Sequence, residues 1–525
     1  MQNLRSNDRS LCNPFVSRHA DDIVGVLSCF DRLLFKGYLM PIGYPDGMAR
    51  FLSRRGVLLK DFKKFVTGHS EEVKRHGLEM AAEAGRPYIA LKSRRQSRNK
   101  DERARRIAAD DQISEGLICV MSSVEQCQSF QLQYGKGRPR LVSASPRCLC
   151  LYFYFQDPSF GLIHVRIQTW FPFVVQVYMN GHEWLARQMT KAGLGYEQVD
   201  NAFVSIGDFS LAQRLSDRLA QLNWVSQLDR LARRVNPLLK GLLKGLHYYW
   251  VTDQAEYATD IVFRSVDALK GLYGRLLHYG VASLEPQDVM TFLGRRLHGN
   301  FEGDLRTTLT TRQPGARIKH WAKGNWLKMY NKHGLVLRIE TVINRPSEFR
   351  VRRMGKRNGQ LQMGWFPMAK RVANLPRYAE VCWSSNHRYM EAISAVENPA
   401  DAYALLDKLC NPVTRDGQRY RGLNPLRREE LAMFAVALRG ENAMQGFRND
   451  HLRSGLGLPR PPDPPGRKRI ASRVGRLLRL LRAHGLIRRI PHTRAYRATV
   501  KGLTLMTAVL SLHRFELVAE VNTCM

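Results

Sequence analysis

The sequence predicts a multidomain protein of the mixed α/β class (α+β). Its 525 residues are enough for two to four domains, and 44% of them are hydrophobic, which suffices for buried cores. Segments with the two-residue period of strands and the longer period of helices also alternate along the chain. We expect an α/β and antiparallel β region at the N-terminus, followed by a helical middle.

The N-terminal unit, residues 1–115, is expected to contain a long strand over 24–39, which is apolar and β-branched in its first half. The segment Tyr44-Pro-Asp-Gly47 is interpreted as a turn before helical spacing, and a short strand follows at 87–90. Residues 92–106 hold eight basic residues against two acids, so they fit a solvated helix start, a mobile basic loop or a nucleic-acid contact.

Residues 116–200 are predicted to form an antiparallel sheet, with a hairpin loop at 157–161 and a helix after Asn180. Cys148 and Cys150 should share one strand face. The nine cysteines include no CxxC pair, and His164 alone does not complete a zinc site, so we expect buried, reduced thiols.

Residues 201–315 are predicted to be helical, including 252–260. Residues 316–410 are expected to hold an aromatic and basic stretch, a strand or hairpin from Leu335, and a helix over 379–410. The last unit, residues 411–525, contains a segment with five prolines at 458–469, which is interpreted as a stiff connector.

The charge balance is strongly basic, with 82 Lys and Arg against 46 Asp and Glu, a net charge of +36 and a pI near 10.2. Such an excess indicates a polyanionic partner, which is nucleic acid more often than a membrane surface. No apolar run is long enough to span a bilayer, and the first residues lack an apolar signal core, so a cytoplasmic location is expected.

The segment SRVGRLLRLLRAHG places Val474, Leu477, Leu478 and Leu481 on one stripe of a helix. Gly485 should end this helix in a left-handed conformation. LIRRI and AYRATV are then predicted to be strands, followed by a further helix. No acid occurs between 466 and 515, which favours a phosphate partner.

Over about the last hundred residues this pattern resembles the winged-helix superfamily, and REELAMFAVALRG and NAMQGFRNDHLRSGL would supply the preceding helices. The resemblance implies a groove-facing surface, made by Ser472, Arg473, Arg476 and Arg479, and a wing with His492, Thr493 and Arg494. The helical period places Arg469 with Arg476 and Arg479, away from the apolar stripe. The proline-rich insert departs from the pattern, and a winged helix that contacts protein is the alternative.

Acids on the other segments motivate a search for a metal site, because nucleases and transposases hold Mg²⁺ with two or three carboxylates. Asp31 and Glu340 lie on predicted strands, while Asp253, Glu256 and Asp260 would share a helix face. We predict catalytic residues Asp31, Glu256 and Glu340, and metal ligands Asp31, Asp253 and Glu340. The alternative is that these acids pair with the abundant arginines. No zinc, nucleotide or flavin motif is present.

The stretch at 317–334 combines aromatic rings with lysines, a mixture that stacks on bases while holding phosphates. The residues assigned to this contact are Lys319, Trp321, Lys323, Trp326 and Lys328, with Arg352 and Arg353 on a basic hairpin nearby. The aromatic rings fit a protein core equally well.

Two functions therefore stay open. The first is a DNA-processing enzyme of the mobile-element type, a Mg²⁺-dependent nuclease or transposase. The second is a non-catalytic DNA- or RNA-binding regulator or assembly protein. Convergence of Asp31, Glu340 and one acid of 253–260 would separate them.

Overall fold

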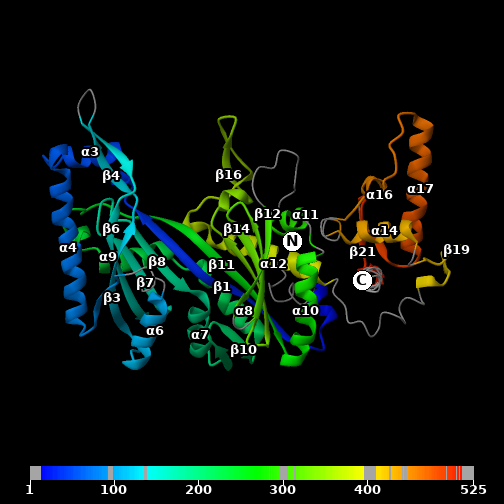
Figure 1. Cartoon of the computed structure of the whole chain (residues 1–525), viewed down its shortest axis with the longest axis horizontal. Coiled ribbons are helices and arrows are strands. Elements are labelled where there is room, and N and C mark those ends of the chain that lie inside the picture. The colour runs from blue at the N-terminus through cyan, green and yellow to red at the C-terminus, as the bar shows by residue number, and fades with distance from the viewer. Residues whose placement is uncertain are drawn as a thin grey trace, which may run out of the picture. The chain divides into compact units, whose positions relative to one another are not determined.

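The structure is a computed structural model of the chain (Figure 1). It describes residues 13–510 apart from 93–98, 135–138, 283, 285, 295–304, 313–314, 395–408, 425–426, 440–441, 443–445, 492, 504 and 508. A large sheet, separate hairpins and many helices confirm the predicted mixed α/β class.

The main feature is an eleven-stranded sheet in the order β12-β13-β14-β15-β11-β1-β8-β7-β6-β3-β2. Its strands are β1 (Ile23–Tyr38), β2 (Tyr88–Ala90), β3 (Gly116–Gln126), β6 (Arg147–Asp157), β7 (Gly161–Gln168), β8 (Val175–Asn180), β11 (Tyr249–Phe263), β12 (Leu305–Arg312), β13 (Gly315–Ala322), β14 (Asn325–Lys332) and β15 (Val336–Ile343). The registers of β12 to β14 and of β1, β8, β7, β6 and β3 are antiparallel, whereas β2 pairs with β3 in parallel.

Helices connect these strands in the N-terminal half and the middle of the chain. They are α3 (Pro45–Ser53), α4 (Phe62–Glu83), α6 (Lys100–Asp110), α7 (Gly181–Lys191), α8 (Phe209–Asp217), α9 (Trp224–Val235), α10 (Val266–Ala282), α11 (Pro286–Phe292) and α12 (Leu375–Ile393). Internal contacts divide the chain into two compact units. One holds the chain up to Leu27, Thr259–Thr341 and the chain from Trp383; the other holds Ser28–Ala258 and Val342–Cys382.

Two local predictions were wrong. Residues 252–260 lie in β11 rather than in a helix, since β-branched and aromatic residues there are buried on both faces. The segment Tyr44-Pro-Asp-Gly47 is not an independent turn but the start of α3. Pro45 occupies the first helical turn, where its missing N–H costs nothing.

The C-terminal region has its own hydrophobic core. It contains α14 (Arg428–Leu438), α16 (Asn449–Gly455), α17 (Pro464–Ala483), the hairpin of β20 (Ile487–Arg489) and β21 (Tyr496–Ala498), and a further helical stretch from residue 500. The helix with the leucine stripe, the following hairpin and the helical stretch after it lie where the sequence predicts them. Val474, Leu477, Leu478 and Leu481 are buried, and Gly485 has φ +71°.

The proline-rich segment differs from its prediction. Residues 464–469 are not a connector but the first turns of α17, because Asp463 caps the helix by accepting a hydrogen bond from the Gly466 N–H at 2.6 Å. Pro464 and Pro465 occupy positions that need no donor.

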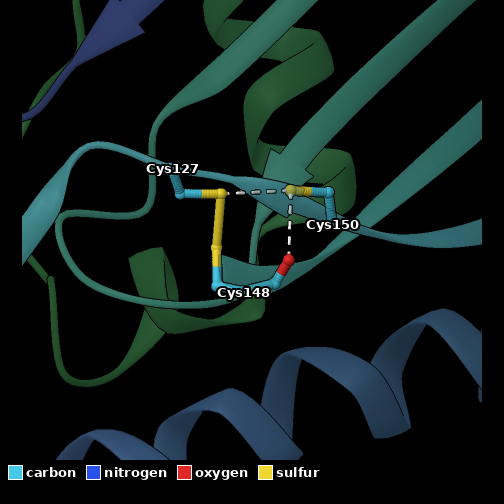
Figure 2. Close-up of side chains that lie close together, drawn as sticks. All are labelled: Cys127, Cys148 and Cys150. Carbon is cyan, nitrogen blue, oxygen red and sulfur yellow. Dashed lines mark hydrogen bonds between the residues drawn. A yellow bond between two sulfur atoms is a disulfide. The ribbon is translucent and has the colours of Figure 1, made fainter. Parts of the chain in front are cut away.

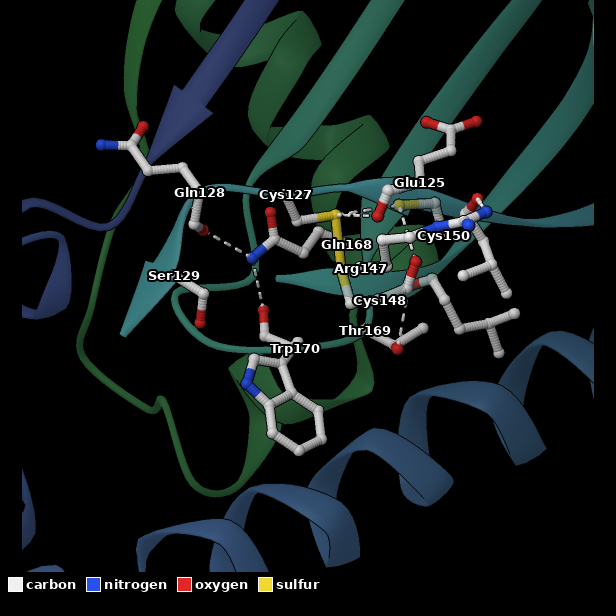
Figure 3. The surroundings of a disulfide bond; sticks show 12 residues. Glu125, Cys127, Gln128, Ser129, Arg147, Cys148, Cys150, Gln168, Thr169 and Trp170 are labelled. Carbon is white, nitrogen blue, oxygen red and sulfur yellow. Dashed lines mark hydrogen bonds between the residues drawn. A yellow bond between two sulfur atoms is a disulfide. The ribbon is translucent and has the colours of Figure 1, made fainter. Parts of the chain in front are cut away.

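The sheet also differs from the prediction at its cysteines. Cys148 and Cys150 do share one face of β6, but Cys148 forms a disulfide with Cys127, and Cys150 Sγ lies 3.5 Å from Cys127 Sγ (Figure 2). Burial raises the pKa of the Cys150 thiol to about 12. Around the disulfide, Gln168 donates hydrogen bonds to the carbonyls of Gln128 and Trp170 (Figure 3). Cys150 and four further cysteines of the described chain, Cys29, Cys119, Cys382 and Cys410, are free thiols.

Within the described residues, no helix combines the length and the apolar character needed to cross a bilayer.

The disulfide should contribute measurably to stability. Cys127 and Cys148 are 21 residues apart in sequence, and a closed loop of that length stabilises by about 3 kcal/mol through the unfolded state. We expect Cys148→Ala to lower the free energy of unfolding by about that amount, measured by chemical denaturation. Cys410→Ala, at an exposed free thiol, is the matched control and should have little effect. Equal stability of both variants would contradict the prediction.

Candidate metal centre and nucleic-acid interface

Three carboxylates come together on neighbouring strands of the large sheet. Strands β15, β11 and β1 are adjacent, and they carry Glu340, Glu256 and Asp31 in that order. One carboxylate oxygen of each residue lies within 4.8 Å of the other two. The residues are only 0%, 9% and 7% exposed, respectively, so the group is largely withdrawn from water. We call these three residues the acidic cluster.

Contacts at both ends of β1 and β11 align these two strands. At one end, the Arg264 N–H just after β11 donates to the Asp22 carbonyl just before β1 at 2.8 Å. Toward the other end, Gly37 faces the ring of Trp250, and a Cβ at this glycine would lie 2.8 Å from the indole. The strands therefore run antiparallel, and the acids of both strands lie between these two contacts.

Strands β11 and β15 are tied together on the side of the acidic cluster. The Phe263 N–H donates to the Leu335 carbonyl at 2.8 Å. Further along, Arg338 donates through Nε and Nη2 to the two carboxylate oxygens of Asp260, at 2.6 and 2.7 Å. Both side chains of this pair are buried, so it is a fixed bidentate link rather than a loose surface pair.

Asp31 is oriented by side chains from the end of β8 and from the segment after it. Asn201 and Asn180 donate to its Oδ1 at 2.9 and 3.5 Å. His182 Nδ1 lies 3.2 Å from the same oxygen, and the other ring nitrogen of His182 lies 3.2 Å from Cys29 Sγ. These partners fix the position of one carboxylate oxygen.

The start of α7 adds a favourable field at Asp31. The side-chain oxygen of Asn180 caps this helix by accepting from the N–H groups of His182 and Glu183, as predicted for a helix after Asn180. The positive end of the helix dipole consequently lies beside Asp31, where it favours the ionised carboxylate.

Glu340 is held by two groups of β14. Lys328 Nζ donates to its Oε1 at 3.1 Å, and the Tyr330 hydroxyl donates to its Oε2 at 2.8 Å. Because Glu340 is fully buried, the ammonium group offsets part of the charge that the acidic cluster concentrates.

Asp253, predicted as a metal ligand, lies elsewhere. It forms ion pairs with Lys36 at 2.9 Å and Lys370 at 3.5 Å. The reason is the strand conformation of β11, in which side chains alternate between faces, so Asp253 and Glu256 point to opposite sides. The expected helix face shared by both residues and Asp260 does not exist. For Asp253 and Asp260 the alternative of ordinary ion pairing is what the structure shows.

The aromatic and basic stretch forms the β13–β14 hairpin. In its register Trp321 pairs with Trp326, and Lys319 pairs with Lys328. These side chains are partly exposed and share one face, whereas the opposite face contributes Ile318, Leu327 and Met329 to the core. Lys319 Nζ lies 3.8 Å from the centroid of the Trp326 ring, and Arg306 of β12 lies over Trp321. Lys323 is in the turn.

This face leads directly to the acidic cluster, because Lys328 and Tyr330 belong both to the hairpin face and to the environment of Glu340. Cationic and aromatic side chains therefore extend across β13 and β14 up to the carboxylates.

On α17 the side chains of Arg469, Ser472, Arg473, Arg476 and Arg479 are exposed, opposite the buried leucine stripe. Arg473 is partly engaged, since it donates to Glu429 of α14 at 2.7 Å. In the β20–β21 hairpin Arg494 is exposed, whereas Thr493 donates its hydroxyl to the Ile490 carbonyl. His492 lies outside the described residues.

Arg352 and Arg353 belong to β16 (Arg350–Arg357), which forms a hairpin with β17 (Gln360–Pro367). They point to opposite faces of it. Arg352 is exposed, whereas Arg353 donates to the carbonyls of Met354 and Pro367.

The chain matches no family model, and neither the curated proteins nor the solved structures include a significant match to it.

Sequence reasoning missed the partners of the acids. The sequence patterns place Lys328 and Tyr330 only in the aromatic stretch, and they do not single out His182, Asn180 or Asn201 as partners of an acid. The two-residue spacing of Lys328 and Tyr330, which puts both on one face of a strand, is the signal that links them.

A divalent cation should bind to the acidic cluster and stabilise the fold. At a concentration 100-fold above its dissociation constant, the gain is about 2.7 kcal/mol. We expect Mn²⁺ or Mg²⁺ to raise the midpoint of thermal unfolding of the wild type, and Glu256→Gln to abolish this rise. In EDTA the same variant should unfold at a higher temperature than the wild type, because it removes one repelling charge.

Asp253→Asn is the matched control, since it removes a carboxylate from the opposite face of the same strand. It should keep the metal-induced rise. A rise that persists in Glu256→Gln and in Asp31→Asn would show that the cation binds elsewhere.

Proposed function

We propose that the protein is a DNA-processing enzyme of the mobile-element type, a metal-dependent nuclease or transposase, delivered to DNA by a C-terminal winged helix. The observation that carries this proposal is the convergence of Asp31, Glu256 and Glu340 on three adjacent strands. A basic and aromatic sheet face adjoins them.

The electrostatics of the acidic cluster support a bound cation. At an effective dielectric constant of about 20, two unit charges 4.8 Å apart repel by roughly 3 kcal/mol, and three carboxylates form three such pairs. Lys328 and the helix dipole at Asp31 offset part of this repulsion. Oxygen ligands at this spacing suit Mg²⁺ or Mn²⁺, which bind carboxylates and the phosphates of a substrate together.

Bound there, the metal ion would polarise a phosphodiester and lower the pKa of an attacking water or 3′-hydroxyl. The protein's own groups have separate tasks. Asn201 and Asn180 hold Asp31, and Tyr330 holds Glu340, so the ligand oxygens are preorganised. Lys328 supplies a fixed positive charge beside the site, where negative charge develops on the phosphate during reaction.

Binding energy would come from the basic surfaces. Helix α17 contains no acid, and of its exposed arginines Arg473 is engaged with Glu429 of α14. Lys319 and Arg306 lie over the two tryptophan rings of the β13–β14 hairpin. Phosphate contacts of this kind fix the position of DNA without reading its sequence. They would hold a strand against the sheet face that leads to the acidic cluster.

The proposed activity predicts metal-dependent cleavage or strand transfer. The full-length protein, incubated with Mg²⁺ or Mn²⁺ and labelled single-stranded, duplex and branched DNA and RNA, should give products that EDTA prevents. Asp31→Asn and Glu340→Gln should each abolish the products, because a ligand is lost, while nucleic-acid affinity is kept or raised by the loss of negative charge. Gel electrophoresis measures the products, and a binding titration measures the nucleic-acid affinity.

Asp253→Asn should cleave at the wild-type rate. Cleavage that survives substitution of Asp31 and of Glu340 would place the reaction elsewhere. Metal binding at the acidic cluster without any product would favour the second candidate, a non-catalytic nucleic-acid-binding regulator or assembly protein.

The winged-helix proposal makes a separate prediction about affinity. Replacing Arg476 and Arg479 of the full-length chain with Ala should weaken duplex DNA binding and reduce the slope of log affinity against log salt by about 1–2, because each lost phosphate contact contributes about 0.9. The buried leucine stripe is untouched, so thermal unfolding should be unchanged. Arg439→Ala and Arg448→Ala, on the segments before α17, are the controls and should leave the affinity and the salt slope unchanged. Equal affinity and slope would reject α17 as the contact surface.

A further inference from the structure

The β16–β17 hairpin forms a two-stranded sheet of its own and projects from the body as a ribbon (Figure 1). Asn358 and Gly359 form its turn, with φ of +51° and +79°. Two successive residues in the left-handed conformation form the two-residue turn whose twist matches that of the flanking strands. Asn-Gly is the preferred sequence of this turn.

One face of the hairpin is closed by its own side chains. The Phe366 ring lies over Gly355, where a Cβ would come within 2.7 Å of the ring. The Arg353 guanidinium stacks on the same ring at 5.3 Å and donates to the Pro367 carbonyl. These contacts stiffen the ribbon, and they involve only one of its two faces.

The opposite face carries an exposed apolar ridge. Cross-strand pairs align Arg352 with Trp365, Met354 with Met363, and Lys356 with Leu361. The apolar members are all strongly exposed: Trp365 66%, Leu361 65%, Met363 55% and Met354 46%. All eight tryptophans of the chain lie in its described part, and Trp365 is the exposed one among them.

The charge around this ridge indicates the chemistry of its partner. Residues 349–379 contain eight Lys and Arg and no Asp or Glu. Arg352, Lys356 and Arg357 make no ion pair with any residue that the structure describes. A partner that suits both features offers apolar surface together with negative charge, as the bases and phosphates of a nucleic-acid strand do.

We infer that the Trp365 face of the hairpin binds unpaired bases where the two strands of a duplex separate. Inside a duplex both flat faces of each base are covered by the neighbouring base pairs, so away from the duplex ends Trp365 could stack only on a base that has left the helix. Arg352 and Lys356 lie beside the ridge, where they would meet the phosphates of the same strand.

A lipid surface fits less well. The tip of the hairpin, residues 357–360, is entirely polar, so insertion tip-first into a bilayer would bury polar groups. The apolar residues lie along the face of the ribbon rather than at its end, which suits a strand lying across it.

The inference deepens the proposed function, on which its biological meaning rests, by specifying DNA with a separated strand as the substrate. Its test does not depend on catalysis. Full-length protein in EDTA is titrated with fluorescent blunt duplex, a forked duplex and single-stranded DNA of the same sequence. Wild type should bind the fork more tightly than the blunt duplex.

Trp365→Ala should lose about tenfold in affinity for the forked and single-stranded DNA, the effect typical of one lost stacking contact, and bind the blunt duplex as before. Trp365→Phe should retain most of the affinity, because a flat ring remains. The matched control is Leu58→Ala, an exposed apolar residue outside the hairpin, which should leave all three affinities unchanged.

Three results would overturn the inference: equal loss on all three DNAs, no loss on any of them, or binding to vesicles containing phosphatidylserine that depends on Trp365 while DNA binding does not. A Trp365→Ala variant that no longer prefers the forked duplex but cleaves DNA at the wild-type rate would sustain the inference. A fork preference that requires Trp365 in a protein without cleavage would sustain it while the nuclease proposal fails.

Discussion

Alternation of side chains along β11 is the constraint on which the rest of the site depends. Because successive residues of a strand point to opposite faces, Glu256 and Asp260 share one side of the sheet and Asp253 takes the other. Antiparallel neighbours on both sides then bring Asp31 and Glu340 to the same side. A shift of one residue in any of these strands would remove its acid from the group.

Burial gives this arrangement its chemical character. Exposed acids can lie close together at little cost, but carboxylates that are at most 9% exposed repel strongly and need compensation. The structure provides a lysine, a tyrosine hydroxyl, two side-chain amides and a histidine around the acids. In the neighbouring Arg338–Asp260 pair the two opposite charges bind each other, so this pair acts as a structural link between β15 and β11.

Local signals predicted much of the fold. The long strand at 24–39, the antiparallel strands of 116–179, the cap at Asn180 and the leucine stripe of α17 all follow from periodicity or capping within a few residues. The prediction was wrong where two conformations share a signal. Residues 252–260 contain acids at helical spacing, but buried aromatic and β-branched neighbours favour a strand. Prolines at 464–465 break a helix in its interior yet start one at its end.

The sequence by itself determined the excess of positive charge, the class of the fold and the candidate acids Asp31, Glu256 and Glu340, because charge, periodicity and residue type are local properties. It could not determine which acids meet, that Lys328 and Tyr330 bind Glu340, that Cys127 bonds to Cys148, or that Trp365 is exposed. Each of these depends on which strands become neighbours and in what register. Such pairings join residues up to hundreds of positions apart, and only the tertiary structure decides them.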